Sequence, residues 1–352
     1  MNVTFLIGNG FDLNLGLKTR FRDFYDYYLK QESPNRTVKA FKEELSENLE
    51  NWSDLEIVLG QYASNFNKSS EKKFISLLDD IQDSLADYID KEDVEFTIAE
   101  GDRKKIYSDL FAPETYLTLR EQESFLAYKK QFIATHWYID AVVFNYTKAF
   151  ERVLSWNGKQ LNISTRIVGS SSLSNVVKSI EHIHGTTSSD MILGVNDSSQ
   201  INNEQLGGST ETVRAMVKTE ININAGTLRD RRCTASLEKA DLICIYGMSL
   251  GDTDRYWWQT IAKKLKSSNT RLIIFAKSGE ITARRSYRSQ NIKDAIINTL
   301  LSHSNLTEDE KLRIGKQIFV CLNSNMFKAT IILPEKEISK PASLLAIEQI
   351  PS

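Results

Sequence analysis

The chain has 352 residues, with 44 Lys and Arg against 46 Asp and Glu, which gives a formal net charge of −2 at pH 7. A near-neutral charge provides no overall field that would attract the whole molecule to nucleic acid or to anionic lipid. The three cysteines form no C-x-x-C pair, which argues against a zinc knuckle or a disulfide framework. No stretch approaches the roughly 20 apolar residues of a membrane span, and the first residues do not resemble a signal peptide. We therefore expect a cytoplasmic protein with no metal site and no membrane partner.

Short apolar segments rich in β-branched residues predict a buried parallel sheet. They lie at residues 3–7, 141–144, 191–195, 242–246, 271–275 and 318–322, and residues 327–333 would add an edge strand. Between the first two, apolar residues recur every three to four positions, which is typical of helices. The Ser-rich residues 169–175 are expected to form a loop. The pattern predicts an α/β core at residues 1–36 and 137–335, an inserted helical subdomain at 37–136 and a C-terminal tail at 336–352.

The motif GNGFD occupies residues 8–12, directly after the first predicted strand. Glycine lets the backbone approach a phosphate closely and adopt a positive φ, and the following helix N-terminus favours negative charge. The third glycine of the G-x-G-x-x-G fingerprint would fall at position 13, which is Leu13, so a dehydrogenase is not indicated. We predict a turn that binds a nucleotide phosphate, with a purely structural turn as the alternative.

Two further motifs place polar side chains before and after the second predicted strand. Residues 53–56, Ser-Asp-Leu-Glu, fit a capping box in which Ser53 and Glu56 bond each other's backbone amides. The alternative is that Asp54 and Glu56 line a cleft. Asn145 follows the strand at 141–144, where the carboxyl end of a parallel strand faces the ligand crevice. Capping of the next helix is the alternative role for Asn145.

Two of the four histidines of the chain lie two residues apart, at His182 and His184. On a strand, this spacing places both imidazoles on one face. We favour one catalytic histidine, His184, with His182 as a supporting neighbour, over two polar histidines at a strand end. A metal site lacks a clear third ligand. After the strand at 242–246, the motif GMSLGDTD at 247–254 provides a second glycine turn, a hydroxyl and two carboxylates, with helix capping as the alternative.

These motifs together resemble the bacterial abortive-infection AbiH family. The likeness is carried by GNGFDLNLGL at residues 8–17, WSDLE at 52–56, FNYT at 144–147, HIHG at 182–185 and GMSL at 247–250. It extends from the first strand to about residue 275. The resemblance implies a role in defence against bacteriophage. Such a role allows a phage trigger or a partner protein, and it also allows the chain to form a homo-oligomer.

The same order of motifs is similar, more distantly, to sirtuin-like NAD-binding domains. This resemblance implies a sirtuin-like, Rossmann-type parallel sheet with the helical insertion. It places Gly8 and Gly10 at the pyrophosphate of NAD, and Gly247 with Ser249 at the adenosine half. Asn145 would then contact the nicotinamide ribose or position a water molecule.

In the same resemblance, His184 would be the base. The sequence departs from the sirtuin pattern at Asp12, where sirtuins have Ser, and at Thr147, where they have an acidic residue. The zinc cysteines of sirtuins are absent from the sequence, which argues against protein deacetylation. Breakdown of NAD, the activity of sirtuin-like defence effectors, stays compatible with the motifs.

Cleavage of the bond between nicotinamide and ribose passes through an oxocarbenium-like centre, which calls for a nearby anion, a positioned water and a general base. We predict Asp12, Asn145 and His184 as the catalytic residues in these three roles, with NAD as the substrate. The predicted nucleotide-binding residues are Gly8, Asn9, Gly10, Phe11, Gly247, Ser249, Leu250 and Asp254.

Two other functions stay open from the sequence. A nuclease or another toxin that acts on nucleic acid would use the arginine-rich residues 229–232 and 284–288 to contact phosphates, although we favour surface solvation as the explanation for both. Nucleic acid is therefore not an expected partner. A non-catalytic sensor would bind NAD or a related nucleotide without turnover and engage a partner through the helical insertion.

Overall fold

The structure of the protein is a computed structural model, and it describes residues 1–47, 54–279 and 284–334. Its centre is a seven-stranded sheet in the order β4-β5-β3-β1-β6-β7-β8. Strand β4 pairs antiparallel with β5 at one edge, and all other neighbours pair in parallel. The strands are β1 (Asn2–Ile7), β3 (Trp137–Val143), β4 (Leu161–Val168), β5 (Ser171–His182), β6 (Leu242–Tyr246), β7 (Arg271–Ala276) and β8 (Ile318–Leu322).

The parallel strands follow the order 3-2-1-4-5-6 when they are counted along the chain, which is the order of the doubly wound dinucleotide-binding fold. The direction of winding reverses between β1 and β6. In such a sheet a ligand crevice opens beyond the carboxyl ends of the strands at this reversal. The expected mixed α/β fold with a mostly parallel sheet is therefore confirmed.

Helices cover both faces of the sheet because side chains alternate along each strand. On β1, Phe5 and Ile7 belong to one hydrophobic core and Leu6 belongs to the other. The first core contains α6 (Glu100–Phe111), α7 (Leu119–Lys129) and α8 (Ala149–Leu154). The second contains α12 (Arg229–Lys239), α13 (Arg255–Ser267), α14 (Ser286–Ser302) and α15 (Glu308–Gly315). None of the described helices has the length and apolar character that crossing a bilayer requires.

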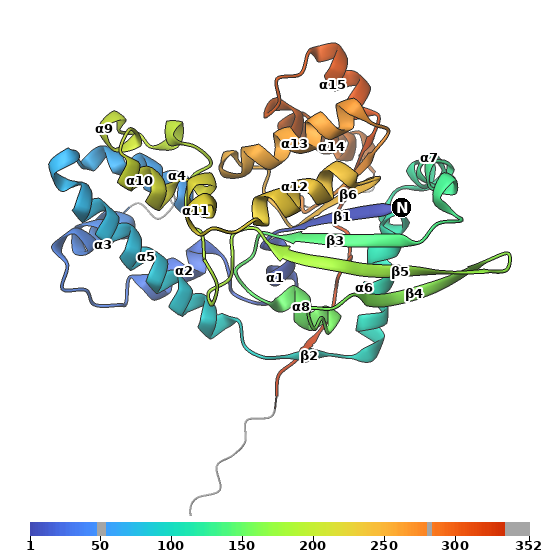
Figure 1. The fold of residues 1–352 in the computed structure, drawn as a ribbon, viewed down its shortest axis with the longest axis horizontal. Coiled ribbons are helices and arrows are strands. Elements are labelled where there is room, and N and C mark those ends of the chain that lie inside the picture. Colours follow the sequence, from blue (N-terminus) through green and yellow to red (C-terminus); the bar gives the residue numbers. More distant parts are fainter. Residues whose placement is uncertain (48–53, 280–283, 335–352) are drawn as a thin grey trace, which may run out of the picture.

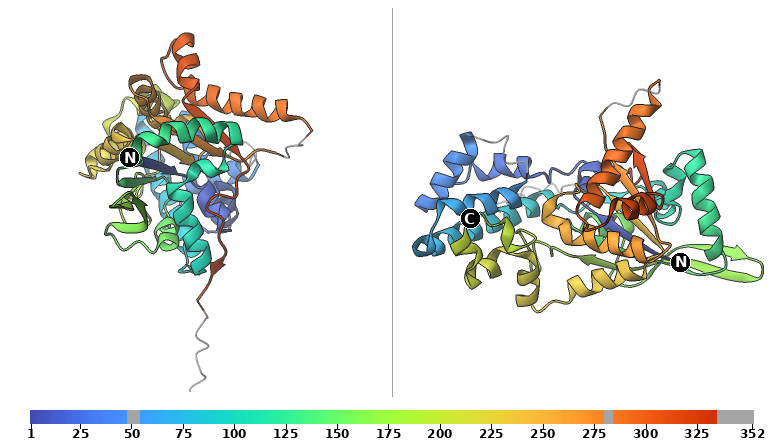
Figure 2. Two further views of the ribbon diagram at one scale, coloured as in Figure 1. Left: turned by 90° about the vertical axis from the view of Figure 1, so that its right-hand side faces the viewer. Right: turned by 90° about the horizontal axis from the view of Figure 1, so that it is seen from above.

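A third core forms a helical lobe beyond the carboxyl ends of the strands (Figure 1 and Figure 2). We use this name for α2 (Phe21–Tyr28), α3 (Arg36–Glu47), α4 (Leu55–Tyr62), α5 (Glu71–Glu92), α9 (Glu204–Gly207) and α10 (Thr210–Met216). Helix α11 (Lys218–Asn224) continues from α10. Residues 37–136 thus contribute to two cores, because α3 to α5 pack in the lobe and α6 and α7 pack on the sheet. The division of the chain into domains stays a prediction.

Two predictions about strands are wrong. Residues 191–195 form no strand, and Met191, Leu193 and Val195 instead pack in the core of the helical lobe. Their apolar character therefore reflects burial and not a place in the sheet. The expected loop at 169–175 contains the start of β5, whose polar composition hid it. Strands β4 and β5 form a hairpin that projects past the other strands, so its side chains are largely solvated (Figure 1).

The prediction that residues 327–333 add an edge strand to the main sheet is also wrong. Only β9 (Ile331–Ile332) is a strand there, and it pairs with β2 (Thr97–Ile98) in a separate two-stranded sheet. The tail predicted at 336–352 lies outside the described residues, as do Trp52 and Ser53. Helix α1 (Gly10–Asn14) follows the predicted glycine turn after β1.

Candidate functional site

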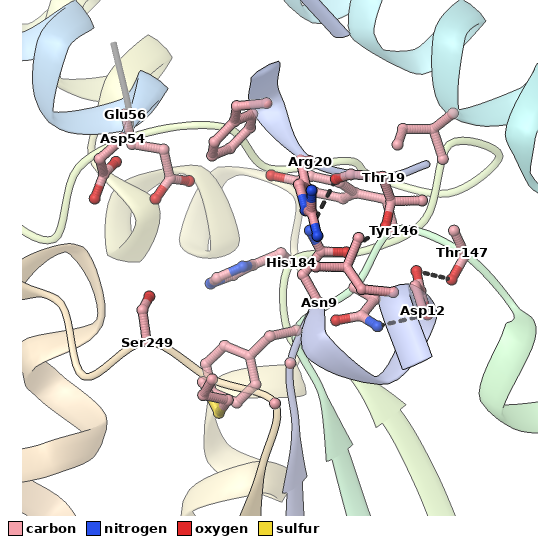
Figure 3. Close-up of a pocket in the computed structure, with 18 of the residues that line it drawn as sticks. Asn9, Asp12, Thr19, Arg20, Asp54, Glu56, Tyr146, Thr147, His184 and Ser249 are labelled. Atoms are coloured by element: carbon pink, nitrogen blue, oxygen red, sulfur yellow. Dashed lines mark hydrogen bonds between the residues drawn. The ribbon is translucent and has the colours of Figure 1, made fainter. Parts of the chain in front are cut away.

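A cavity of ≈ 610 Å³ lies between the carboxyl ends of the central strands and the helical lobe (Figure 3). Its position is the crevice that the strand order predicts at the reversal between β1 and β6. The lobe contributes Asp54, Glu56 and Tyr25 to the lining, and the segment before α2 contributes Arg20. The predicted site residues in the lining are Gly8, Asn9, Asp12, Asn145, His184, Gly247, Ser249 and Asp254.

Three predicted nucleotide-binding residues, Gly10, Phe11 and Leu250, are not part of this lining. The side chain of Phe11 is fully buried and packs edge-on against Phe150, with a ring-centroid distance of 5.2 Å. Leu250 packs against the core under α13, and its carbonyl accepts a hydrogen bond from His303. Phe11 and Leu250 therefore support the turns that carry the cavity residues.

The two glycine turns are in direct backbone contact. Gly10 N donates to Gly247 O at 2.7 Å, and Gly8 N donates to Tyr246 O at 2.9 Å. A Cβ on Gly10 would lie only 2.5 Å from the Cα of Gly247, and Gly247 itself has φ +68°. Glycine is required at both positions because no side chain fits this approach and this φ. The amides of Gly8 and Gly10 are thus engaged within the protein, so a phosphate near this turn has to be bound by other groups.

The structure brings two of the predicted catalytic residues into contact. Asp12 is 1% exposed, and it accepts hydrogen bonds from Asn145 Nδ2 at 2.8 Å and from Thr147 Oγ1 at 2.7 Å. Burial raises the pKa of Asp12 to about 7, although the hydrogen bonds from Thr147 and Asn145 oppose the shift. Asp12 therefore orients the Asn145 amide and does not itself project into open space.

The orientation of Asn145 has a consequence for the cavity. Because Asp12 accepts from the amide nitrogen, the amide oxygen must face away from Asp12. Within the described part of the chain, Asn145 Oδ1 has no hydrogen-bond partner, and the residue is only 6% exposed. A buried polar atom without a partner is costly, so this oxygen is a site for a hydrogen-bond donor from a ligand or water. Asn145 is not a helix cap, because α8 begins at Ala149.

The two histidines do not share a face, so that prediction is wrong. Strand β5 ends at His182, and Gly185 turns the backbone with φ +69°. His182 contacts the Asn145 carbonyl at 2.8 Å and Glu151 Oε1 at 2.7 Å, and these partners raise its pKa although burial lowers it. His182 is thereby held away from the cavity, whereas His184 lines it.

His184 is a neutral histidine in contact with a carboxylate. It is 6% exposed, and burial together with the nearby Lys218 lowers its pKa to about 3. Its Nε2 lies 3.5 Å from Asp254 Oδ1, and its ring packs edge-on against Phe144. At this pKa the imidazole is a weak base at neutral pH, and the Asp254 carboxylate, which raises the pKa, would stabilise the imidazolium when a proton is transferred.

A buried ion-pair cluster beside His184 was not predicted from the sequence. Lys218 Nζ lies 2.8 Å from Glu56 Oε2 and 3.1 Å from Asp254 Oδ1, and it also donates to the Thr253 carbonyl. Burial raises the pKa of Glu56 to about 7 despite Lys218, and the negative charge of Asp254 adds to the rise. Burial lowers the pKa of Lys218, but Asp254 and Glu56 together raise it above its usual value. No local motif around Lys218 signals this contact.

The predicted capping box is replaced by a simpler cap. Ser53 lies outside the described residues, and Asp54 is the N-cap of α4, with Oδ1 accepting from Ile57 N at 3.2 Å. Glu56 does not cap the helix, because its carboxylate bonds Lys218. The alternative from the sequence, in which Asp54 and Glu56 line a cleft, is confirmed.

Arginines in two regions of the chain differ in their availability to a ligand. Arg20 and Arg22 are exposed and line the cavity. Arg229 and Arg232, from the predicted basic stretch, are instead bound to acidic residues, Asp190 at 2.9 Å and Glu181 at 2.7 Å. Ion pairing within the protein therefore accounts for these two arginines, and contact with nucleic acid is not needed to explain them.

The described residues show no side-chain cluster suited to a metal ion, and their thiols are buried. Across residues 1–47, 54–279 and 284–334, no group of three or more His, Cys, Asp or Glu side chains is placed to hold a metal ion. Independence from metal stays a prediction. Cys233, Cys244 and Cys321 are buried free thiols, and burial raises the pKa of each.

The chain matches a family model described as bacteriophage abortive infection AbiH over residues 4–276. The match covers most of the chain and includes every residue that we have placed in the cavity. It confirms the AbiH resemblance, whereas the likeness to sirtuins stays a prediction. No curated protein matches the chain.

Proposed function

The chain belongs to the bacteriophage abortive infection AbiH family, and on that premise we propose that it is an antiphage effector that binds and hydrolyses NAD. The reaction would cleave the bond between nicotinamide and ribose and release ADP-ribose. The observation that carries the proposal is the unpartnered Oδ1 of Asn145, held by Asp12 in a cavity at the reversal point of a dinucleotide-binding strand order.

The size and charge of the cavity support a dinucleotide ligand. Its volume of ≈ 610 Å³ lies within the range of about 300–1,000 Å³ that is typical of small-molecule sites. Arg20 and Arg22 supply positive charge for the two phosphates, because guanidinium groups form strong charge-assisted hydrogen bonds with phosphate oxygens. Arg20 follows Thr19, whose carbonyl accepts a hydrogen bond from Asn9 of the glycine turn.

The side chains suit a hydrolytic step at the ribose carbon. In our proposal a water molecule attacks this carbon, its C–O bond forms as the bond to nicotinamide breaks, and nicotinamide leaves as a neutral molecule. His184 accepts the proton that the water loses, and Asp254 stabilises the resulting imidazolium at 3.5 Å. Asn145 Oδ1 accepts a hydrogen bond from the water or from a ribose hydroxyl. Asp12 is a positioning residue that fixes the Asn145 amide.

The test is to incubate the purified full chain with NAD and measure nicotinamide and ADP-ribose by mass spectrometry. We expect Asn145→Ala and His184→Ala to lower the rate by about 10²–10⁴-fold. The control is His136→Ala, a change at an exposed histidine outside the cavity lining. NAD levels in infected cells that express each variant are measured in parallel, because an effector can require a phage trigger.

Three outcomes separate the functions. Nicotinamide release that depends on His184 and Asn145 supports the enzyme. Binding of NAD without nicotinamide release, in purified protein and in infected cells, would instead indicate the non-catalytic sensor. An unchanged NAD pool together with cleaved cellular RNA would indicate the nuclease. Full activity of His184→Ala would show that the assigned base is wrong.

A further inference from the structure

We propose that the cavity selects a dinucleotide with free ribose hydroxyls, NAD rather than its 2′-phosphorylated form NADP, through Asp54 and Ser249. This inference rests on the proposed function and adds the choice of dinucleotide to it. Neither residue belongs to the predicted catalytic set. Asp54 comes from the helical lobe and Ser249 from the turn after β6, so the selecting site would form between the lobe and the sheet.

The usual selecting residue of the doubly wound fold is missing from this chain. In that fold an acidic side chain after the second parallel strand bonds the ribose 2′-hydroxyl of NAD. The second parallel strand here is β3, and the residues that follow it are Phe144, Asn145, Tyr146 and Thr147, none of which is acidic. A carboxylate that binds ribose in this protein must therefore come from another element.

Asp54 offers such a carboxylate in a fixed orientation. Its Oδ1 caps α4 by accepting from Ile57 N, which leaves Oδ2 on the side of the turn after β6. A Cβ on Gly251 would lie 3.9 Å from Asp54 Oδ2 and 3.9 Å from Ser249 Oγ, so both oxygens flank this glycine. Figure 3 shows Asp54 and Ser249 on the same side of the cavity, away from Asp12 and Thr147. An acceptor and a hydroxyl that both lie near Gly251 offer partners for the two neighbouring hydroxyl groups of a ribose.

The charges at this side of the cavity disfavour an additional phosphate. Glu56 lies there with Asp54, and Lys218, the cation in contact with Glu56, is shared with Asp254, which also contacts His184. A 2′-phosphate would add about 1.5 to 2 negative charges near the Asp54 and Glu56 side chains, going by the charge of other phosphate monoesters at pH 7. Like charges brought together at a recognition site strongly disfavour the wrong ligand.

An independent observation fixes the opposite end of the ligand. The buried, unpartnered Asn145 Oδ1 calls for a hydrogen-bond donor near Asp12, away from Asp54 and Ser249. A dinucleotide bonded to Asn145 at its nicotinamide ribose would extend past the glycine turn, with its second ribose at Asp54 and Ser249. In this arrangement the two ends of the cavity bind hydroxyl groups, and Arg20, which Figure 3 shows between Asp54 and Asp12, faces the phosphates.

The experiment measures kcat/KM for NAD and for NADP with the purified full chain. We expect the wild-type value for NADP to be lower by about 100-fold. Asp54→Asn is expected to narrow the ratio of kcat/KM for NAD to that for NADP to about 10-fold, because it removes the negative charge. The Asn side chain keeps an oxygen that caps α4 about equally well. Asp252→Asn is the matched control, since Asp252 is an exposed carboxylate that pairs with Arg255 outside the cavity lining. This control should keep the wild-type ratio.

A binding measurement with the wild type avoids any question about folding of the variant. ADP-ribose should bind with a Kd about 100-fold below that of its 2′-phosphorylated form. Equal use of NAD and NADP, or an unchanged ratio in a folded Asp54→Asn variant, would overturn the selectivity and leave NAD hydrolysis standing. If the chain neither binds nor consumes either dinucleotide, the proposed function is wrong and the selectivity falls with it.

Discussion

Asp12 and Glu56 are buried carboxylates at two ends of the same cavity, and their partners differ in kind. Asp12 accepts hydrogen bonds from the neutral groups of Asn145 and Thr147, whereas Glu56 shares the cation Lys218 with Asp254. Burial nevertheless raises the pKa of both carboxyls to about 7. The two acids that share Lys218 differ as well, because the pKa of Asp254 is lowered despite its burial, so the cation compensates the burial of Asp254 but not that of Glu56.

The two ends also differ in how the chain assembles them. Asp12, Asn145 and Thr147 follow β1 and β3, which are neighbouring strands of one sheet. Glu56 on α4 and Lys218 on α11 are 162 residues apart in sequence, and the pair meets Asp254, which follows β6, because the helical lobe packs over the strand ends. The first end is therefore part of the sheet, and the second depends on the position of the lobe.

The largest expected effect comes from removing the shared cation. Lys218→Met leaves Glu56 and Asp254 buried without a positive charge, and we expect it to lower the free energy of unfolding by about 3–5 kcal/mol. Urea denaturation at pH 7 measures the change. Lys239→Met, at an exposed lysine, is the control and should stay within about 0.5 kcal/mol of the wild type. Adding Glu56→Gln to Lys218→Met should restore part of the loss, and a loss below about 1 kcal/mol for the single variant would contradict the shared-cation description.

A smaller effect is expected at the neutral end. Asn145→Ala leaves one oxygen of Asp12 without its donor, which we expect to cost about 1–3 kcal/mol in unfolding free energy. The matched control is Asn162→Ala at an exposed position of β4, which should change stability little. In the double variant Asp12→Asn with Asn145→Ala, the buried charge is gone and part of the cost should disappear. If the double variant is no more stable than Asn145→Ala alone, Asp12 is not the source of the cost.

The smallest effect is a dependence of stability on pH. The pKa of Asp12 is raised from 3.8 in a model peptide to about 7 in the folded protein, so the folded state binds this proton more tightly than the unfolded state. Its contribution is therefore fully present below about pH 4 and is lost as the pH rises through about 7. Between pH 6 and pH 8 the wild type should lose about 1–2 kcal/mol relative to Asp12→Asn. Urea denaturation of both proteins across this pH range measures the difference. If the unfolding free energies of the wild type and of Asp12→Asn change with pH in the same way, Asp12 does not titrate as described.

Much of the fold could be predicted from the sequence. Apolar, β-branched segments located β1, β3, β6, β7 and β8, because buried parallel strands need continuous apolar side chains. Strands β4 and β5 were missed because their hairpin leaves polar residues in solvent, so Ser171 and its neighbours resemble a loop. Residues 191–195 were misread for the opposite reason, since burial under the lobe also selects apolar residues.

The sequence by itself determined which residues stand at the strand ends, because glycine turns and strand patterns are short-range signals. Gly8, Asn145, His184 and Gly247 all reach the cavity for this reason. Only the tertiary structure decided which groups face each other there. It joined Lys218 to Glu56, turned His182 away from the cavity, and placed both Asp54 and Ser249 near Gly251. Such contacts depend on how distant elements pack, and burial, which sets the pKa of Asp12, Glu56 and His184, is a property of that packing alone.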